Sequence, residues 1–262
     1  MRLIDCPECD RVCYDHTIFD VGEPDLANVA EVQRRHWLDK AAEKKAGADN
    51  YDTAYNMTAY RYVREAFVRA IGEQKVMRVV DFGCGPGATI TYLSENFPGT
   101  QFSYLGFEPN RDFAERARAV ASQVSFDATI RSEDADSALK LDRPWGETKT
   151  DLFLALGTLC YVHPHLTRML FSSLRGMAER IIVRDYLGNR EGASEAAIIL
   201  YHKHFPMFAH PYRRYLNGAG FEIQRVSSSI AGPYDGRHWE VLEAGRDRDS
   251  GVLDSVVTNR IR

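Results

Sequence analysis

The sequence predicts an α/β fold in which a parallel sheet carries helices on both faces. Short apolar segments alternate with helical stretches of ten or more residues from Val76 onward, which is typical of buried parallel strands joined by helices. A glycine-rich loop stands between the first of these strands and the helix that follows it. The chain of 262 residues is long enough for one large domain with its own core.

Five apolar segments in the middle of the chain have the length and composition of buried strands. They are Val76–Phe82, Gln101–Phe107, Val124–Ile130, Asp151–Leu156 and Arg180–Asp185. Helical stretches are predicted between them, at Ala88–Asn96, Arg111–Ala121 and His165–Met177. The alternation predicts that these strands belong to one parallel sheet.

After the fifth strand the pattern becomes less regular. A helical insert is predicted over Glu191–Lys203, followed by a further helix over Pro211–Asn217. Two strands, Phe221–Ser229 and His238–Ala244, then close the domain. The tail from Arg246 is rich in charged residues, so we expect it to fray.

The first fifty residues differ from the rest of the chain. A turn is predicted over Phe19–Pro24, a helix over Asp25–Lys45 and a second, amphipathic helix over Thr58–Ile71. We therefore expect three regions: a small N-terminal helical cap or lid at 1–50, the sheet domain at 51–245 and a charged tail at 246–262.

Composition and charge exclude several classes of protein. With 44% hydrophobic and 27% charged residues the chain has the balance of an ordinary globular protein. A net charge of −4 repels phosphate backbones, so nucleic acid is not an expected partner. There is no run of about 18 apolar residues that could span a bilayer, and the N-terminus lacks the apolar stretch of a signal peptide. We therefore expect a cytoplasmic protein.

The strongest chemical signal is the glycine loop, V-V-D-F-G-C-G-P-G at residues 79–87. Glycines let the backbone approach a ligand closely, and the helix that follows offers free N–H groups. The spacing also satisfies the dinucleotide pattern, so two cofactor classes compete here. Asp81 precedes the first glycine, where a carboxylate can meet an ammonium group, and Pro86 removes a donor that a pyrophosphate would need. These features, and the lack of room for a separate substrate domain, favour a cofactor with a single nucleoside over a dinucleotide.

The motif D-F-G-C-G-P-G resembles the first motif of the class I S-adenosylmethionine-dependent methyltransferases. Three further motifs follow in the order of that family. Glu108 ends the second predicted strand, D-L-F-L-A-L-G-T-L at residues 151–159 is similar to the fourth-strand motif, and L-N-G-A-G-F-E-I at residues 216–223 is similar to the entry to the late strands. The resemblance covers about Tyr51 to Gly245, most of the chain.

The resemblance implies a seven-stranded sheet whose last strand is antiparallel, and it implies a site. Each cofactor-binding residue is assigned by its position in the motifs. Asp81 would lie near the amine of the methionine part, Glu108 would bind both ribose hydroxyls, and Asp134 would meet the adenine. The backbone under the methionine part would come from Gly83, Gly85 and Gly87, and the methyl end would be lined by Leu156 and its neighbours.

The acceptor side is predicted from residue types and their places after the strands. Methyl transfer to a hydroxyl or an amine can need a general base, which is most often His near neutral pH. His163 and His204 are the candidate bases. Asp185, at the end of the fifth strand, is a candidate acceptor-binding residue, and its alternative role is to cap the next segment. Tyr51 and Tyr55 are expected near the sulfonium and the acceptor, with core packing as the alternative.

A cysteine cluster lies at the N-terminus. Cys6, Cys9, Cys13 and His16 offer three sulfurs and a nitrogen, a ligand set that suits zinc, whereas free thiols are the alternative. Residues 19–28 are also similar to a segment of the sugar C-methyltransferases, which begin with a zinc-binding C-x-x-C. A second cysteine pair and the long C-terminal domain of that family are missing from this sequence.

Taken together, these observations predict a methyltransferase that uses S-adenosylmethionine and acts on a small molecule. Zinc would be a second cofactor if the cysteine cluster binds it. A sugar or a secondary metabolite with a hydroxyl or amine group is the expected kind of acceptor. The alternatives are an RNA or protein methyltransferase, a non-catalytic S-adenosylmethionine-binding protein, and an NAD-binding reductase. No oligomeric state is predicted.

Overall fold

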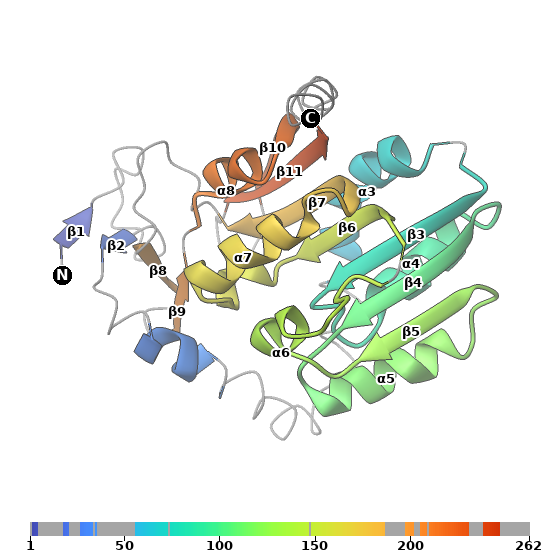
Figure 1. Ribbon diagram of the computed structural model, residues 1–262, viewed down its shortest axis with the longest axis horizontal. Helices are drawn as coiled ribbons and strands as arrows, with labels where there is room; N and C mark the ends of the chain where they lie inside the picture. The colour runs from blue at the N-terminus through green and yellow to red at the C-terminus, as the bar shows by residue number, and fades with distance from the viewer. Residues whose placement is uncertain are drawn as a thin grey trace, which may run out of the picture.

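The computed structural model describes residues 2–4, 18–20, 27–33, 35, 56–72, 74–146, 148–186, 197–201, 205–208, 210–230 and 238–246. In these parts of the chain one large sheet has helices on both faces, and a smaller sheet lies beyond the carboxyl ends of its parallel strands (Figure 1). No helix in the described ranges is long and apolar enough to cross a membrane.

The large sheet has seven strands. They are β3 (Val76–Phe82), β4 (Gln101–Phe107), β5 (Asp127–Arg131), β6 (Thr150–Leu156), β7 (Ala178–Tyr186), β10 (Phe221–Ile230) and β11 (His238–Arg246). They lie in the order β10-β11-β7-β6-β3-β4-β5. The five strands from β7 to β5 in this order are parallel, whereas β11 is antiparallel to both of its neighbours. The predicted seven-stranded sheet with its last strand antiparallel is confirmed.

Helices cover both faces of this sheet (Figure 1). They are α3 (Asn56–Ile71), α4 (Ala88–Asn96), α5 (Arg111–Ala121), α6 (Ala135–Leu139), α7 (Pro164–Leu174) and α8 (Tyr212–Gly218). The first three pack on one face and the last three on the other. Successive side chains of β6 show this division, because Leu152 and Leu154 belong to the first core and Phe153 and Ala155 to the second.

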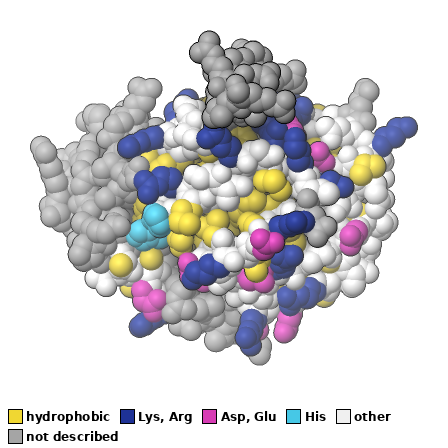
Figure 2. All heavy atoms as spheres, in the orientation of Figure 1, with side chains coloured by type: hydrophobic (Ala, Val, Ile, Leu, Met, Phe, Trp, Pro, Cys, Tyr) yellow, Lys and Arg dark blue, Asp and Glu magenta, His cyan; other side chains and the backbone are white. Residues whose placement is uncertain are grey.

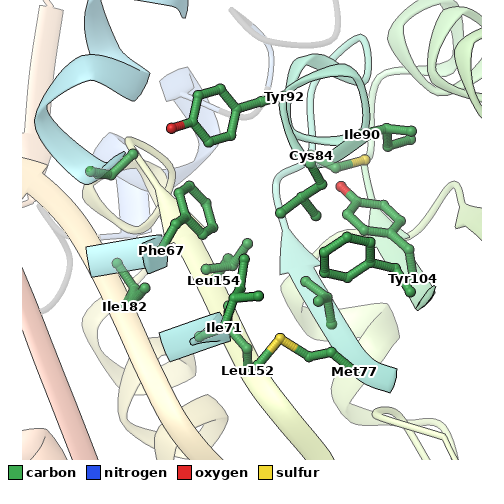
Figure 3. Close-up of a cluster of buried hydrophobic side chains, with 14 of the residues drawn as sticks. Phe67, Ile71, Met77, Cys84, Ile90, Tyr92, Tyr104, Leu152, Leu154 and Ile182 are labelled. Carbon is green, nitrogen blue, oxygen red and sulfur yellow. The ribbon is translucent and has the colours of Figure 1, made fainter. Parts of the chain in front are cut away.

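Figure 3 shows the core between α3 and the sheet in close-up. Phe67 and Ile71 come from α3, and Leu152 and Leu154 come from the middle of the sheet. All four side chains are fully buried. Near the start of α3 the Tyr60 hydroxyl lies 2.7 Å from the hydroxyl of Thr89, so this part of the helix lies close to the glycine loop.

Several predicted elements agree with the structure residue for residue, namely β3, β4, α4 and α5. The other predicted helices and strands of the large sheet domain differ at their ends by one to three residues, and β5 and α7 differ most. β5 pairs with β4 only from Asp127 onward, not from Val124. α7 ends at Leu174 rather than Met177, because Gly176 adopts a φ of 75°, a left-handed conformation that ends helices.

The small sheet joins the start of the chain to the insert after β7. Its strands are β1 (Arg2–Ile4), β2 (Ile18–Asp20), β8 (Ala197–Tyr201) and β9 (Phe205–Phe208), in the order β1-β2-β8-β9. Each neighbouring pair is antiparallel. Two strands from the first twenty residues and two strands from the insert therefore form one sheet.

Two predictions are corrected by this sheet. The helical insert over Glu191–Lys203 is wrong, because Ala197–Tyr201 is a strand that pairs on both sides. The turn over Phe19–Pro24 is wrong at its first two residues, which end β2. Ile198 and Ile199 are β-branched and favour a strand, and their partners in β2 come from the other end of the chain. Of the helix predicted over Asp25–Lys45, residues 27–33 and 35 are helical and the others lie outside the described residues.

A substitution at Gly106 tests how closely β4 packs under the glycine loop. A Cβ at this position would lie 2.8 Å from Cys84 Sγ and 2.9 Å from Ile130 Cδ1. Gly106→Ala is therefore expected to lower the free energy of unfolding by about 1–3 kcal/mol, measured by urea denaturation. Gly99→Ala is the matched control, because a Cβ there meets no atom within 4 Å. Equal losses in the two variants would contradict the expected packing.

Candidate functional site

The loop between β3 and α4 is built on three glycines in left-handed conformations. The φ angle is 78° at Gly83, 54° at Gly85 and 96° at Gly87, and side chains rarely tolerate such values. The N–H groups of Gly83 and Cys84 both donate to the carbonyl of Phe107, at 2.8 and 3.0 Å. The loop is therefore bound to the carboxyl end of β4, and α4 begins directly after it.

The segment after β6 touches the same loop. The Thr158 hydroxyl donates to the carbonyl of Gly83 at 3.4 Å, and a side chain at Gly83 would collide with Thr158. Leu156 ends β6 and is half-buried, and Gly157 follows it with a φ of 74°. The structure thus brings the segment that follows Leu156 into contact with the glycine loop, and the place of Leu156 at the methyl end stays a prediction.

Asp81 lies at the carboxyl end of β3 with its side chain fully buried. Its Oδ2 accepts a hydrogen bond from the Tyr104 hydroxyl at 2.6 Å. Burial raises the pKa of Asp81 to about 6, although hydrogen bonds from Thr89 and Tyr104 oppose that shift. A buried carboxylate of this kind gains from a cationic ligand such as an ammonium group.

Glu108 follows β4 and is also buried. Its Oε2 accepts from the N–H of Gly85 at 3.0 Å, and its Oε1 accepts from the N–H of Asn110 at 2.9 Å. Burial raises the pKa of Glu108 to about 7, and the negative charge of Asp81 adds to the shift. The carboxyl groups of Asp81 and Glu108 therefore lie together beside the loop, each with oxygen lone pairs that can accept further donors.

The adenine side was assigned to Asp134. The structure makes Asp134 the N-cap of α6, where its Oδ1 accepts from the N–H of Ser137 at 2.9 Å. Its neighbour Glu133 was not singled out from the sequence. The Oε2 of Glu133 is buried and has no hydrogen-bond partner among the described residues. The acidic segment after β5 thus contains one carboxylate that caps a helix and one with an oxygen open to a donor.

His163 is the N-cap of α7 and lies half-buried at the edge of the Phe208 ring. Its Nδ1 accepts from the N–H of His165 at 3.2 Å. The proton of the neutral ring is therefore on Nε2, so the ring must release His165 before its Nδ1 can take a proton from an acceptor. The role of His163 as a base stays a prediction.

Asp185 is buried beneath the short 3₁₀ turn η2 (Leu159–Tyr161) that follows β6. Its Oδ2 accepts from the N–H of Cys160 at 2.9 Å and from the Tyr212 hydroxyl at 2.8 Å. These bonds connect the end of β7 to the turn and to α8. The predicted direct contact of Asp185 with an acceptor remains a prediction.

His210 supports the same turn, although it was not chosen from the sequence. It is fully buried, and its Nε2 lies 2.7 Å from the carbonyl of Leu159. Burial lowers the pKa of His210 to about 4, so the ring is neutral near pH 7 and Nε2 donates. The sequence showed a histidine near the pocket but contained no signal for this supporting contact.

The remaining predicted site residues lie outside the described residues. They are Cys6, Cys9, Cys13, His16, Tyr51, Tyr55 and His204. Within the described ranges no group of three or more His, Cys, Asp or Glu side chains could hold a metal ion. The predicted zinc site therefore gains no support here.

Comparison with known proteins decides the family. A family model described as a methyltransferase domain matches residues 33–226, well over half of the chain. The chain belongs to this methyltransferase family. The resemblance to class I S-adenosylmethionine-dependent methyltransferases is thereby confirmed, and the protein is an enzyme of this class.

Solved structures share the fold at low sequence identity. The magnesium protoporphyrin IX methyltransferase from Synechocystis PCC 6803 matches with a TM-score of 0.57 and 17% identity, over 84% of this chain and 100% of that chain. An O-methyltransferase from a trans-AT PKS multienzyme of Brevibacillus brevis matches at 0.53 and 14%, over 78% of each chain. The geranyl diphosphate C-methyltransferase from Streptomyces coelicolor A3(2) matches at 0.51 and 13%, over 71% of this chain and 79% of that chain. At these identities the similarity shows the fold alone.

The raised pKa values predict that cofactor binding releases protons. In the free protein the pKa values of Asp81 and Glu108 are about 6 and about 7, so both carboxyl groups are partly protonated near pH 6. S-adenosylhomocysteine offers donors that bind the ionised forms, so its affinity should rise between about pH 5 and pH 8. The same shifts make the free protein less stable as pH rises through this window, because the unfolded carboxyl groups ionise at lower pH.

Isothermal titration in two buffers of different ionisation enthalpy counts the released protons. Glu108→Gln cannot ionise, so it should bind S-adenosylhomocysteine more weakly and release fewer protons near pH 6. Asp142→Asn is the matched control, because the side chain of Asp142 is fully exposed and is no part of the proposed site, so proton release should stay unchanged. Equal proton release by the wild type and Glu108→Gln would contradict a role of Glu108 in binding.

Proposed function

We propose that the protein transfers a methyl group from S-adenosylmethionine to a hydroxyl or amine of a small molecule. The observation that carries this proposal is the meeting of Asp81, Glu108 and the glycine loop at the carboxyl edge of the sheet. Two buried carboxylates suit an ammonium group and a pair of ribose hydroxyls. The glycines let a nucleoside lie directly against the backbone.

The protein residues have separate roles in this reaction. When bound at this edge, the cofactor supplies a methyl group on a sulfonium, which the acceptor displaces in line. Asp81 would bind the amine of the methionine part, and Glu108 would bind the ribose hydroxyls. Leu156 would confine the methyl end. His163 or His204 would take the acceptor proton. The main role of the protein is thus to hold the acceptor atom, the methyl group and the sulfur in a line.

A small acceptor is favoured over a nucleic acid by charge. The net charge is −4. On the face shown in Figure 2, Lys and Arg side chains lie in separate groups among acidic and apolar ones, and they form no continuous basic surface there. The names of the solved neighbours mention magnesium protoporphyrin IX and geranyl diphosphate, which are small molecules. A sugar or another secondary metabolite is the acceptor class that we propose.

Residues 1–50 are proposed to form a cap over the acceptor side, with Tyr51, Tyr55 and Asp185 nearby. The support for this placement is the small sheet, in which the N-terminal strands pair with the insert after β7. Its strand β9 packs on the turn η2, at the carboxyl end of β6. The acceptor would therefore enter between the large sheet and this unit in the cytoplasm, where we expect the enzyme to act.

The cofactor assignment is tested by thermal denaturation with added ligands. S-adenosylhomocysteine at 100 times its dissociation constant should stabilise the protein by about 2.7 kcal/mol, and NADH should have no effect. Detection of S-adenosylhomocysteine release over a panel of sugars and metabolite alcohols and amines would then identify the acceptor. Equal shifts with NADH, or no shift with either ligand, would contradict the proposed function.

We also propose that Cys6, Cys9, Cys13 and His16 bind one zinc ion that orders the cap. A stretch this short cannot bury a core of its own, so a bound metal would supply much of its stability. Elemental analysis of the untagged protein should find about one zinc per chain. Cys9→Ser should remove the metal and lower acceptor turnover while the affinity for S-adenosylmethionine stays near normal. Full activity in a metal-free protein would contradict this site.

A further inference from the structure

The turn η2 is bound by side chains from several separate elements. Asp185 of β7 accepts from the N–H of Cys160, and His210 donates to the carbonyl of Leu159. Thr158, just before the turn, donates to the glycine loop at the carbonyl of Gly83. Any shift of the turn therefore changes the methyl end of the site.

One further bond to this turn comes from the N-terminal helix at residues 27–33. The Gln33 side chain is fully buried, and its Nε2 donates to the carbonyl of Cys160 at 3.3 Å. On the same helix Val32 is half exposed and Arg35 is exposed, so Gln33 is on the side that faces the protein. A buried amide side chain is costly unless it is hydrogen-bonded, so this contact is a specific feature of the helix and not a chance approach.

We propose that Gln33 is a positioning residue that fixes the orientation of the turn η2 and thereby joins the N-terminal helix to the methyl end of the site. The effect on catalysis rests on the proposed function, whereas the contact itself does not. Cys160 is held at both of its backbone groups, by Asp185 at the N–H and by Gln33 at the carbonyl. The peptide that follows Cys160 is also bonded within the turn, because the N–H of Tyr161 donates to the carbonyl of Thr158 at 3.0 Å. Gln33 adds a bond from outside the turn to the carbonyl of the same peptide, so both of its polar groups are held.

This arrangement also links cofactor release to the N-terminal helix. The turn touches the glycine loop through Thr158, so a ligand seated on the loop is retained more firmly while the turn is fixed. Departure of the helix would free the Cys160 carbonyl and loosen the turn. Loss of the Gln33 bond should therefore speed local opening of the turn and speed ligand dissociation together.

Amide hydrogen exchange on the free protein is the first test, because it needs no ligand. The N–H groups of Tyr161 and Val162 donate to carbonyls inside the turn and report its opening. Gln33→Leu keeps most of the side-chain volume and removes the donor, so these amides should exchange about 5- to 30-fold faster. Arg35→Leu, at an exposed position of the same helix, is the matched control and should leave their exchange unchanged.

The dissociation rate of S-adenosylhomocysteine, measured by stopped flow, is the second readout and should rise by a similar factor in Gln33→Leu. If the wild type binds no S-adenosylhomocysteine, the proposed function fails while the exchange experiment still decides the role of Gln33. Unchanged exchange at Tyr161 and Val162 would overturn the proposal. An equal increase in the exchange rates of the β3 backbone amides would overturn it too, because that result would indicate general destabilisation of the fold.

Gln33→Glu distinguishes a hydrogen bond from mere packing. Its carboxylate would face the Cys160 carbonyl and repel it, whereas the protonated acid can donate as the amide does. At about pH 8 the variant should therefore exchange faster than the wild type. As the pH is lowered to about 5, the ratio of the two exchange rates should fall toward one. The titratable groups in or around the turn are common to both proteins; among the described residues they include Asp185, Cys160, Tyr161, His163, His210 and Tyr212. A pH-independent ratio would overturn the hydrogen-bonding role.

Discussion

The carbonyl of Phe107 fixes the site, because it accepts two successive N–H groups of the glycine loop. The loop must lie against the end of β4 to make these bonds, and only a residue without a side chain can occupy Gly83 beside Thr158. Glu108 comes directly after Phe107 and reaches the N–H of Gly85. One short stretch of β4 therefore determines both the course of the loop and the position of the acid that faces it.

Strand alternation then divides the chemistry between the two faces of the sheet. Asp81 shares a face with Val79, which packs under α3 and α4, and its carboxylate accepts a hydrogen bond from Tyr104. Asp185 shares a face with Val183, which packs with α7 and α8. Its carboxylate supports the turn η2 from beneath. These two acids, both at carboxyl ends of parallel strands, thus have different surroundings because their side chains point to opposite faces of the sheet.

The sequence was sufficient for the glycine loop between β3 and α4 and for most of the large sheet. Strands such as Val76–Phe82 are apolar, locally consistent and flanked by glycine turns, so propensity and burial agree. Ala197–Tyr201 is different, because its conformation depends on pairing with Ile18–Asp20. Gln33 likewise shows no motif in the sequence, since its partner is a backbone carbonyl 127 residues away. Local patterns contain no information about such partners.

The small sheet, where we propose the acceptor side, depends on the rest of the fold. Its strands come from the start of the chain and from the insert after β7, so the large domain must first bring these segments together. Closing so long a loop costs conformational entropy before any strand pairing offsets that cost. The cofactor side has no such requirement, because the glycine loop and Glu108 lie within two successive strand–helix units. The turn η2 therefore depends on a distant residue such as Gln33, whereas the glycine loop and Glu108 are positioned by contacts within one short part of the chain.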